Sequence, residues 1–270
     1  MDRPRYRLLT CDLDGTLLQD HRFVSDRVRW AIAAARERGV CVTLATGRSY
    51  QSTRPHAQSL GIDQPLICYQ GALICDANTG QALRRATLDP SLVDEAIELS
   101  RAEGWHLILY ADEDILLTEY RYAEDMYRQM LGPTFRRVND LRSALRDGVV
   151  KVTFMDDEEL TPTIEARMRH LFADRIQVLR SHPMFVEGLP PGSSKGSALV
   201  WLAQQLGVPQ SEVMAIGDQD NDVAMLHWAG LGVAMGNGSQ RCRQVADWIA
   251  PAIEEDGAAV AIERFVLSEV

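Results

Sequence analysis

The sequence contains no long apolar run, and that absence excludes a membrane-spanning helix. A helix needs about 20 consecutive apolar residues to cross a bilayer, and no stretch of the 270-residue chain approaches this length. The first residues, Met1–Pro4, lead directly into a strand-like segment, without the apolar stretch of a signal peptide. We therefore expect a cytoplasmic protein that does not engage a membrane.

Positive charge is scarce as well. Lysine and arginine together number 28 against 38 aspartates and glutamates, which gives a formal net charge of −10 and a pI near 5.1. An acidic protein is not attracted to nucleic acid or to an anionic membrane surface, so we expect neither as a partner. A small anionic substrate stays compatible with this charge, because a bound divalent cation and a few basic side chains can make one pocket locally positive.

Cysteine is sparse, with five residues at positions 11, 41, 68, 75 and 242 and no CxxC pair. Three of them lie in apolar strand-like runs, which indicates small buried side chains in a reducing compartment rather than a metal or redox site. Internal repeats and low-complexity tracts are also missing. The length exceeds that of one typical domain, so a large domain with a second, smaller one is expected.

Strand-like and helix-like segments alternate at both ends of the chain. In the first part we expect helices at 26–38 and 49–60 between apolar strands at 6–12, 40–46 and 65–69. Later the alternation resumes, with helices at 194–206, 221–228 and 238–246, strands at 213–217, 231–235 and 248–249, and a C-terminal helix. Nearly continuous apolar strands are typical of a parallel sheet buried on both faces. This order predicts an α/β fold with a doubly wound parallel sheet.

The middle of the chain has a different pattern and reads as an inserted α+β unit of about 100 residues. Its expected helices lie at 90–103, 121–131 and 159–173, and its strands at 105–110, 115–120, 149–155, 176–180 and 184–188. Pro190-Pro191-Gly192 marks its end. We therefore predict a core of residues 1–83 and 189–270 and an insertion of residues 84–188, with hinges near Ala82–Arg85 and Gly188–Gly192.

Two aspartates stand one residue apart where the first strand ends, in Asp12-Leu13-Asp14-Gly15-Thr16. Side chains at i and i+2 of a strand point the same way. Two carboxylates this close repel each other unless a cation lies between them or one holds a proton. A metal-assisted phosphoryl-transfer site supplies both remedies, because one carboxylate can attack phosphorus and the other can exchange a proton. The alternative is a pair of aspartates that cap a turn.

Three further clusters fall near the edge where open α/β sheets bind ligands. Thr46-Gly47-Arg48 offers a hydroxyl and backbone amides that suit phosphate oxygens, although such loops are common without a ligand. Lys195 lies in the first turn of a helix, where the macrodipole disfavours it; it can balance a phosphate charge or simply be solvated. Gly217–Asp222 contains three aspartates, whose oxygens suit Mg²⁺, or it is an acidic helix start.

The order and spacing of these clusters resemble the haloacid dehalogenase superfamily of phosphatases, and in particular its Cof-type branch. The segments 232–238, 246–249 and 255–258 are similar to the tail of that family, so the resemblance covers about residues 5–83 and 189–270. It implies a Rossmann-like core sheet with an α/β cap domain inserted between the second and third motifs. The middle segment matches mainly in its position and its order of elements.

The resemblance implies a role for each matching acidic residue. Asp12 would be the nucleophile and a ligand of Mg²⁺. Asp14 would be the general acid and base, and its backbone carbonyl would also bind the metal. Asp218 would complete the protein ligands, and Asp222 would orient a lysine or a metal-bound water.

The same resemblance assigns the phosphate contacts. Thr46 and the Gly47 amide would hold the transferring phosphoryl group, Lys195 would balance its charge, and Asn221 would contact the phosphate. Arg48 would face the substrate or pair with a carboxylate.

Two positions depart from the family pattern. Gln70 stands where an asparagine is common, which weakens the case for a polar contact there. Gln219 replaces a frequent glycine in the metal loop, which narrows the loop geometry without removing a ligand.

We therefore expect a Mg²⁺-dependent phosphatase that hydrolyses small phosphorylated metabolites, such as sugar phosphates, nucleotides or phosphorylated cofactors, through an aspartyl-phosphate. A phosphomutase or phosphotransferase needs the same core, and a non-catalytic sensor of such metabolites is a third alternative. The cap is expected to close over the site and select the leaving group. His106, Tyr110, Tyr120 and Met184 could line its pocket, although packing or surface positions are expected for each. The sequence leaves the oligomeric state open.

Overall fold

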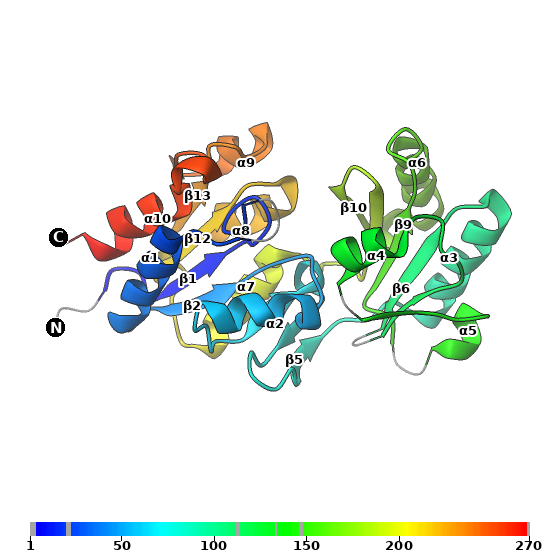
Figure 1. Ribbon diagram of the computed structural model, residues 1–270, viewed down its shortest axis with the longest axis horizontal. Helices are drawn as coiled ribbons and strands as arrows, with labels where there is room; N and C mark the ends of the chain where they lie inside the picture. The colour runs from blue at the N-terminus through cyan, green and yellow to red at the C-terminus, as the bar shows by residue number, and fades with distance from the viewer. Residues whose placement is uncertain (1–3, 20–22, 112–113, 133, 146–147, 269–270) are drawn as a thin grey trace.

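The computed structural model describes residues 4–19, 23–111, 114–132, 134–145 and 148–268. The chain forms two lobes side by side, and both termini lie on the first (Figure 1). Two short connections, at 86–89 and near 190–194, join the lobes. No helix in the described part of the chain is both long and apolar enough to cross a membrane.

The first lobe is built on a parallel five-stranded sheet in the order β14-β13-β12-β1-β2. These strands are β1 (Leu8–Cys11), β2 (Cys41–Leu44), β12 (Val213–Gly217), β13 (Leu231–Ala234) and β14 (Trp248–Ile249). The chain moves from β1 to β2 on one side and later returns to place β12 on the other. This doubly wound order confirms the predicted α/β fold and puts a topological switch point between β1 and β12.

Helices cover both faces of this sheet. They are α1 (Asp26–Glu37), α2 (Tyr50–Ser59), α7 (Lys195–Gln205), α8 (Val223–Trp228), α9 (Gln240–Val245) and α10 (Gly257–Ile262), with shorter helical turns at 210–212, 220–222, 253–255 and 263–267. Leu9 of β1 packs in the cluster that contains α1 and α10, whereas Leu8 packs with α7 and α8. Successive residues of a strand point to opposite faces, so the strands are buried on both sides as predicted.

Strand β3 (Leu66–Cys68) differs from the expectation of a third parallel strand. It joins the parallel sheet only through the single bridge between Ala45 and Ile67. Instead it pairs in antiparallel fashion with β4 (Leu73–Cys75), which pairs with β5 (Ala82–Arg85). The chain reverses at Tyr69–Gly71, where all three residues have positive φ angles. Such angles are rare in residues other than glycine, so Gly71 is the one residue of this turn whose type signals it in the sequence.

The segment predicted as the first hinge is strand β5, which is hydrogen-bonded into the first lobe. The chain crosses to the second lobe after it, through Ala86–Asp89. Residues 84 and 85 therefore pair within the first lobe although the predicted boundary assigns them to the insertion. The division into 1–83 with 189–270 and 84–188 otherwise stays a prediction.

The second lobe holds a six-stranded sheet in the order β10-β11-β9-β6-β7-β8. The strands are β6 (Leu107–Ala111), β7 (Asp114–Leu117), β8 (Phe135–Arg137), β9 (Lys151–Met155), β10 (Gln177–His182) and β11 (Phe185–Leu189). All neighbours are antiparallel except β7 and β8. Of the acidic turn expected between β6 and β7, residues 112 and 113 lie outside the described residues.

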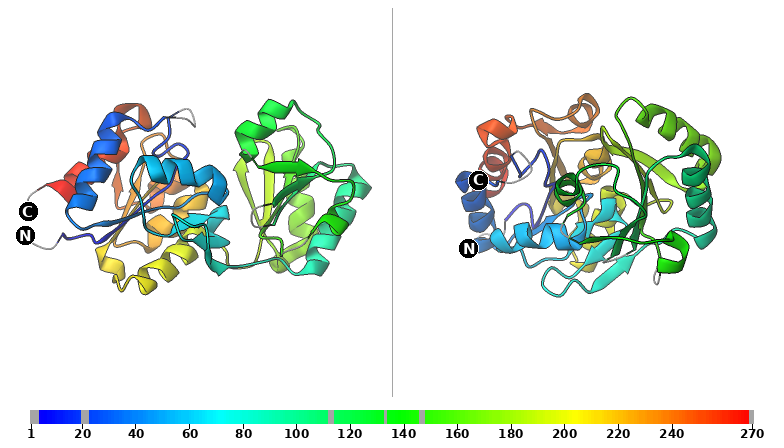
Figure 2. Two further views of the ribbon diagram at one scale, coloured as in Figure 1. Left: turned by 60° about the horizontal axis from the view of Figure 1, so that its bottom comes forward. Right: turned by 45° about the vertical axis from the view of Figure 1, so that its right-hand side comes forward.

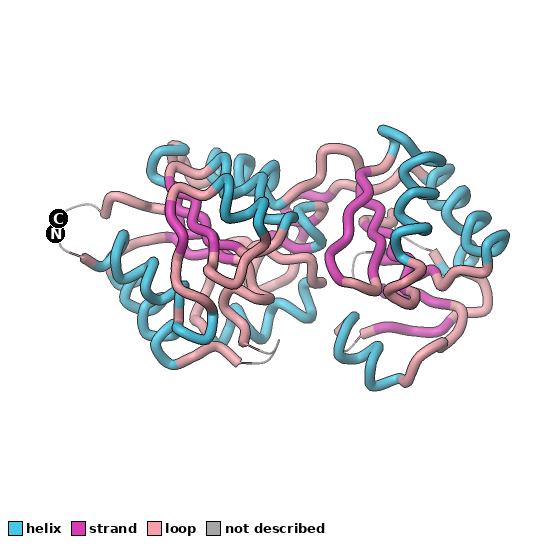
Figure 3. The backbone as a smooth tube through the Cα atoms, turned by 90° about the horizontal axis from the view of Figure 1, so that it is seen from above, coloured by secondary structure: helices cyan, strands magenta, loops and turns pink. Residues whose placement is uncertain are grey.

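Two long helices, α3 (Pro90–Glu103) and α6 (Thr161–Phe172), pack on one face of this sheet (Figure 2). The shorter α4 (Glu124–Leu131) and α5 (Leu141–Ala144) complete the lobe, with a helical turn at 173–175. Val152 and Val186 point to the long helices, whereas Met155 and Phe185 belong to the cluster shared with the first lobe. The opposite face of the sheet therefore looks toward the first lobe (Figure 3).

Candidate active site

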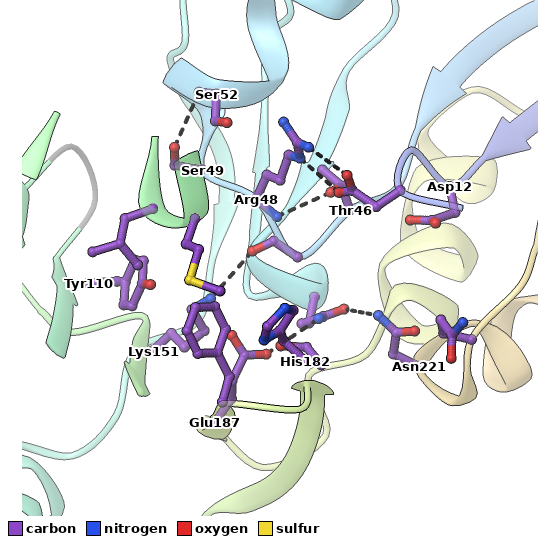
Figure 4. A pocket seen from close by; sticks show the side chains of 18 of the residues that line it. Asp12, Thr46, Arg48, Ser49, Ser52, Tyr110, Lys151, His182, Glu187 and Asn221 are labelled. Atoms are coloured by element: carbon purple, nitrogen blue, oxygen red, sulfur yellow. Dashed lines mark hydrogen bonds and ion pairs between the residues drawn. The ribbon is translucent and has the colours of Figure 1, made fainter. Parts of the chain in front are cut away.

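The predicted site residues gather at the carboxyl edge of the parallel sheet, beside its switch point. Asp12 follows β1, the Thr46-Gly47-Arg48 loop follows β2, and Asp218 follows β12. Lys195 is the first residue of α7. Figure 4 shows this edge facing side chains of the second lobe across a cavity.

Lys195 is fully buried, although the first turn of a helix is an unfavourable place for a cation. Its Nζ donates to Asp12 Oδ1 at 2.6 Å and to Asp222 Oδ1 at 2.7 Å. Burial acts to lower the pKa of Lys195, but the Asp12 and Asp222 carboxylates outweigh it and raise that pKa above its usual value. The ammonium is therefore charged and ties two carboxylates together.

Three buried carboxylates, those of Asp12, Asp218 and Asp222, lie with ligand atoms within 4.8 Å of one another. Burial raises the pKa of Asp12 well above its usual value, with Lys195 opposing this and the neighbouring carboxylates adding to it. Burial, followed by the charge of Asp222, raises the pKa of Asp218 to about 6. Both pKa shifts come first from burial, and the neighbouring carboxylates add to them. A cation at this position would favour the charged forms.

The Asp218 loop is held closely around this cluster. Asp222 Oδ2 accepts hydrogen bonds from the backbone amides of Asp218 and Gln219, at 2.9 and 3.0 Å. Asp218 accepts from the Thr16 hydroxyl at 3.0 Å and from Gln219 Nε2 at 2.9 Å. Gly15 has a φ of +84°, and a Cβ there would lie 2.3 Å from Asp218 Oδ2. A glycine is therefore required for the first strand's loop to close against Asp218.

Asp14 lies apart from the three-carboxylate cluster. Its two oxygens accept from Arg48 Nη2 at 2.5 Å and from Arg48 Nε at 2.7 Å. Of the two expectations for Arg48, the structure shows the pairing with a carboxylate, and both residues also line the cavity. A two-pronged contact of this kind orients a carboxylate firmly.

The Thr46-Gly47-Arg48 loop is bonded to the turn after β3. The Thr46 hydroxyl accepts from the Arg48 amide at 3.1 Å, and the Thr46 carbonyl accepts from the Gln70 amide at 3.0 Å. The Gln70 side chain lies over Gly47, where an added Cβ would come within 2.5 Å of its Nε2. Gln70 also accepts from Asn221 Nδ2 at 2.9 Å. Gln70, for which the sequence indicated a weaker case for a polar contact, therefore makes one with Asn221.

The cavity between the lobes has a volume of about 320 Å³. All of the predicted site residues line it except Asp218 and Asp222, which lie behind Asp12 and Lys195. The second lobe contributes Tyr110, Met126, Gln129, Met130, Leu131, Lys151, Ser181, His182, Phe185 and Glu187.

Of the four residues considered for the pocket of the second lobe, Tyr110 lines this cavity. His106 instead packs in the lobe interior against Tyr127, and Tyr120 lies 41% exposed. Met184 is partly buried against the apolar cluster between the lobes.

Sequence reasoning missed Lys151 and Glu187, which form a buried ion pair of 2.5 Å on the cavity wall. Each is the single charged residue of a largely apolar strand, Lys151–Met155 and Phe185–Leu189. Charged residues are rarely buried unless they are paired. The isolated lysine and the isolated glutamate in these two strands could therefore have predicted a buried ion pair.

Comparison with known proteins agrees with this geometry. Residues 9–262 match the family described as haloacid dehalogenase-like hydrolase. The chain is 35% identical over 234 residues to the HMP-PP phosphatase of Serratia proteamaculans, covering 86% of this chain and 84% of that protein. It is 30% identical to the Bacillus subtilis 5-amino-6-(5-phospho-D-ribitylamino)uracil phosphatase YitU, covering 96% of this chain and 97% of YitU.

The same likeness holds for solved structures. A haloacid dehalogenase-like hydrolase from Bacteroides thetaiotaomicron superimposes with a TM-score of 0.87 at 30% identity, covering 96% of this chain and 99% of that one. Sequence and fold agree over nearly the whole chain, including the second lobe. The protein thus belongs to the haloacid dehalogenase-like hydrolase family and is a phosphatase.

Proposed function

We propose that the protein is a Mg²⁺-dependent phosphatase that hydrolyses small phosphomonoesters through an aspartyl-phosphate on Asp12. The observation that carries the proposal is the placement of Asp12. Its carboxylate lines a cavity of about 320 Å³ and is held by the Lys195 ammonium at 2.6 Å. A nucleophile that is fixed and faces the substrate volume meets the geometric requirement of phosphoryl transfer.

In the first step, an Asp12 oxygen attacks phosphorus and the ester bond to the leaving oxygen breaks. Asp14 gives a proton to that oxygen, and the alcohol leaves; to carry this proton Asp14 must first be released from its ion pair with Arg48. In the second step Asp14 takes a proton from water, the water oxygen bonds to phosphorus, and the Asp12 carboxylate is released with inorganic phosphate. Asp14 lines the same cavity as Asp12, which supports the two roles.

The residues present fit a divalent cation. Three buried carboxylates face one another with the single Lys195 ammonium among them, and hard oxygen ligands are those that Mg²⁺ prefers. We propose that Asp12, the Asp14 carbonyl and Asp218 hold it, while Asp222 orients Lys195. When bound, Mg²⁺ would screen the repulsion between Asp12 and the phosphate dianion.

The remaining site residues would hold the phosphoryl oxygens. The Thr46 hydroxyl accepts from the Arg48 amide, so its own proton is available to a phosphate oxygen. The Gly47 amide, the Lys195 ammonium and the Asn221 amide would donate to the other oxygens. These donors act mainly by positioning the group and stabilising its charge.

The leaving group would occupy the part of the cavity formed by the second lobe, which we propose acts as a cap. Tyr110, Phe185, Met126 and Met130 give this wall aromatic and apolar surface, and polar side chains make up the other half of its lining. Such a wall suits a phosphorylated metabolite with a ring, such as a nucleotide or a phosphorylated cofactor. One relative is named for a phosphorylated uracil derivative, which supports this class of substrate ahead of simple sugar phosphates.

A panel of phosphorylated metabolites, assayed for phosphate release with Mg²⁺ and with EDTA, tests the proposal. We expect metal-dependent release, and we expect Asp12→Asn to abolish it while the melting temperature changes little. Full activity of Asp12→Asn would refute the nucleophile. Isomer formation in place of phosphate release would indicate a phosphomutase, and binding without turnover would indicate a sensor.

A further inference from the structure

A chain of four polar side chains crosses the cavity from the second lobe to the predicted phosphate site. Lys151 Nζ donates to Glu187 Oε1 at 2.5 Å, and Gln70 Nε2 donates to Glu187 Oε2 at 3.4 Å. Asn221 Nδ2 in turn donates to Gln70 Oε1 at 2.9 Å. The ion pair belongs to β9 and β11, whereas both amides belong to the first lobe (Figure 4).

Stability does not explain the ion pair. Lys151 is 4% and Glu187 is 1% exposed, and two buried charges are costly to remove from water. A well-packed apolar pair often stabilises a protein as well or better. The neighbouring positions of both strands are largely apolar and would accept such a pair. The pair therefore needs a reason other than packing.

The ion pair determines the donor and the acceptor in each hydrogen bond that links Glu187, Gln70 and Asn221. A carboxylate only accepts and an ammonium only donates, so Glu187 can receive only a donor from Gln70. Gln70 must then turn its amide nitrogen to Glu187 and its oxygen to Asn221. Asn221 must in turn present its nitrogen to Gln70. One ionised carboxylate in the second lobe thus fixes the orientation of two amides in the first.

The Asn221 amide shows that this orientation is imposed on it. Its Oδ1 is buried and has no hydrogen-bond partner among the described residues. Buried polar atoms are normally paired, and leaving one unpaired is unfavourable. The amide keeps this orientation because Gln70 requires its nitrogen, and one N–H of that nitrogen stays available to another acceptor.

Gln70 is held in an unusual backbone conformation. Tyr69 and Gln70 have φ angles of +48° and +57°, a region that residues other than glycine rarely occupy. Their amides donate to the carbonyls of Arg48 and Thr46, each at 3.0 Å. Backbone strain of this kind collects at functional sites. Here it places the Gln70 side chain over Gly47, between Glu187 and Asn221.

The lysine end of the chain also reaches the phosphate loop. Lys151 Nζ lies 3.4 Å from the Gly47 carbonyl and 4.1 Å from the centre of the Tyr110 ring. The two hydrogen bonds from the ion pair to the first lobe, at Gly47 and Gln70, are each 3.4 Å, at the long end of the hydrogen-bond range. Hydrogen bonds in ligand-free enzymes are often long and shorten when substrate binds.

We propose that Glu187, with Lys151 and Gln70, is a positioning residue that orients the Asn221 amide to donate to the phosphoryl group. This inference rests on the proposed function, in which Asn221 contacts the phosphate. Through Gln70 and Asn221, the second lobe would contribute to phosphate affinity as well as select the leaving group.

Binding of inorganic phosphate, measured by calorimetry with Mg²⁺, tests the proposal independently of turnover. Glu187→Gln keeps the shape of the side chain, but its amide can also donate, so the hydrogen bond with Gln70 can reverse its direction. We expect it to weaken phosphate binding by about tenfold, the loss of one hydrogen bond to a charged group. Asn221→Ala should have a similar effect, and the double variant should bind no more weakly than Asn221→Ala alone.

Two further variants make the test decisive. Glu95→Gln breaks the exposed ion pair of Glu95 with Arg175 at α3 and should leave phosphate affinity unchanged. Gln70→Met removes the hydrogen bonds between Glu187 and Asn221 while keeping the Lys151–Glu187 pair. It should weaken phosphate binding to the same extent, and it replaces Glu187→Gln in the test if that variant does not fold.

The proposal is overturned if the effects of Glu187→Gln and Asn221→Ala multiply, if neither Glu187→Gln nor Gln70→Met weakens binding, or if the wild type binds no phosphate. Multiplying effects of Glu187→Gln and Asn221→Ala on phosphate affinity would not bear on the proposed hydrolysis through Asp12. Turnover by Asp12→Asn would instead refute the proposed nucleophile and leave this inference standing.

Discussion

At the scale of single residues, Lys195 stands out because its charge is fully buried. Its ammonium is buried and bonded to Asp12 and Asp222, so it joins the proposed nucleophile to the loop after β12. A solvated lysine would be replaceable at little cost, whereas a buried charge with two partners is not. The residue therefore links the integrity of the site to the stability of the first lobe.

Replacing Lys195 by methionine tests this link. Lys195→Met leaves two buried carboxylates without their cation, so we expect a loss of about 3–5 kcal/mol in the free energy of unfolding in metal-free buffer. We also expect kcat on an aryl phosphate to fall by about 10²–10³-fold, because a charged donor to the phosphoryl group is gone. Urea unfolding and steady-state kinetics measure the two effects. Arg142→Met, at an exposed ion pair, is the control and should change neither quantity, and an equally mild effect at Lys195 would contradict the account.

His106 gives a second prediction, which concerns pH. Burial, reinforced by the charge of Arg121, lowers the pKa of His106 to about 4, and its Nε2 lies 2.8 Å from the Tyr127 hydroxyl. The unfolded chain binds a proton below about pH 6.5, but the folded protein does so only near pH 4. The stability contributed by neutral His106 is therefore fully present above pH 6.5 and is lost as the pH falls toward 4. The loss amounts to about 2 kcal/mol in the free energy of unfolding at pH 5.

Chemical denaturation of the wild type and of His106→Gln at pH 8 and pH 5 measures this contribution. The stability difference between the two proteins should shrink at pH 5, because glutamine does not titrate. Parallel pH profiles would show that His106 takes up its proton in the folded protein as readily as in the unfolded chain.

At the scale of elements, the helices were the most predictable part. Helix α1 begins at Asp26 with Ser25 as its N-cap, as the sequence indicates, and α3 begins at Pro90 after Asp89. Both signals are local, so neighbouring residues suffice to determine them. Short strands were missed for the opposite reason. β4, β5 and β8 have three or four residues each, and their pairing depends on partners that the local sequence does not reveal.

Ser25→Ala tests the cap of α1. The Ser25 hydroxyl accepts from the Val28 amide at 3.2 Å, and its loss should lower the free energy of unfolding by about 1 kcal/mol. Helices α1 and α10 cover the same face of the sheet, and no residue of α1 lines the cavity. Turnover should therefore not change. Ser25→Asp should retain the stability, and an unstable aspartate variant would indicate a role other than capping.

At the scale of the whole molecule, the sequence predicted residues that gather at the sheet edge but not those on the opposite wall of the cavity. Asp12, Thr46, Lys195 and Asp218 were identifiable because each stands at a strand end or helix start with a characteristic neighbour. Lys151 and Glu187 come from another lobe and meet the site only through tertiary packing. The reversal of β3 was equally unpredictable, since it depends on positive φ angles at Tyr69 and Gln70, which carry no glycine signal.

Asp12 is proposed to accept the phosphoryl group, and chemical trapping of the phosphorylated enzyme is the decisive experiment. The wild-type protein would be mixed with Mg²⁺ and an aryl phosphate, quenched in acid, reduced with borohydride and mapped by peptide mass spectrometry. Borohydride converts an aspartyl-phosphate to homoserine, so the account predicts homoserine at position 12 and none in protein without substrate. Homoserine at another aspartate, or unmodified Asp12 in protein quenched during turnover, would contradict it.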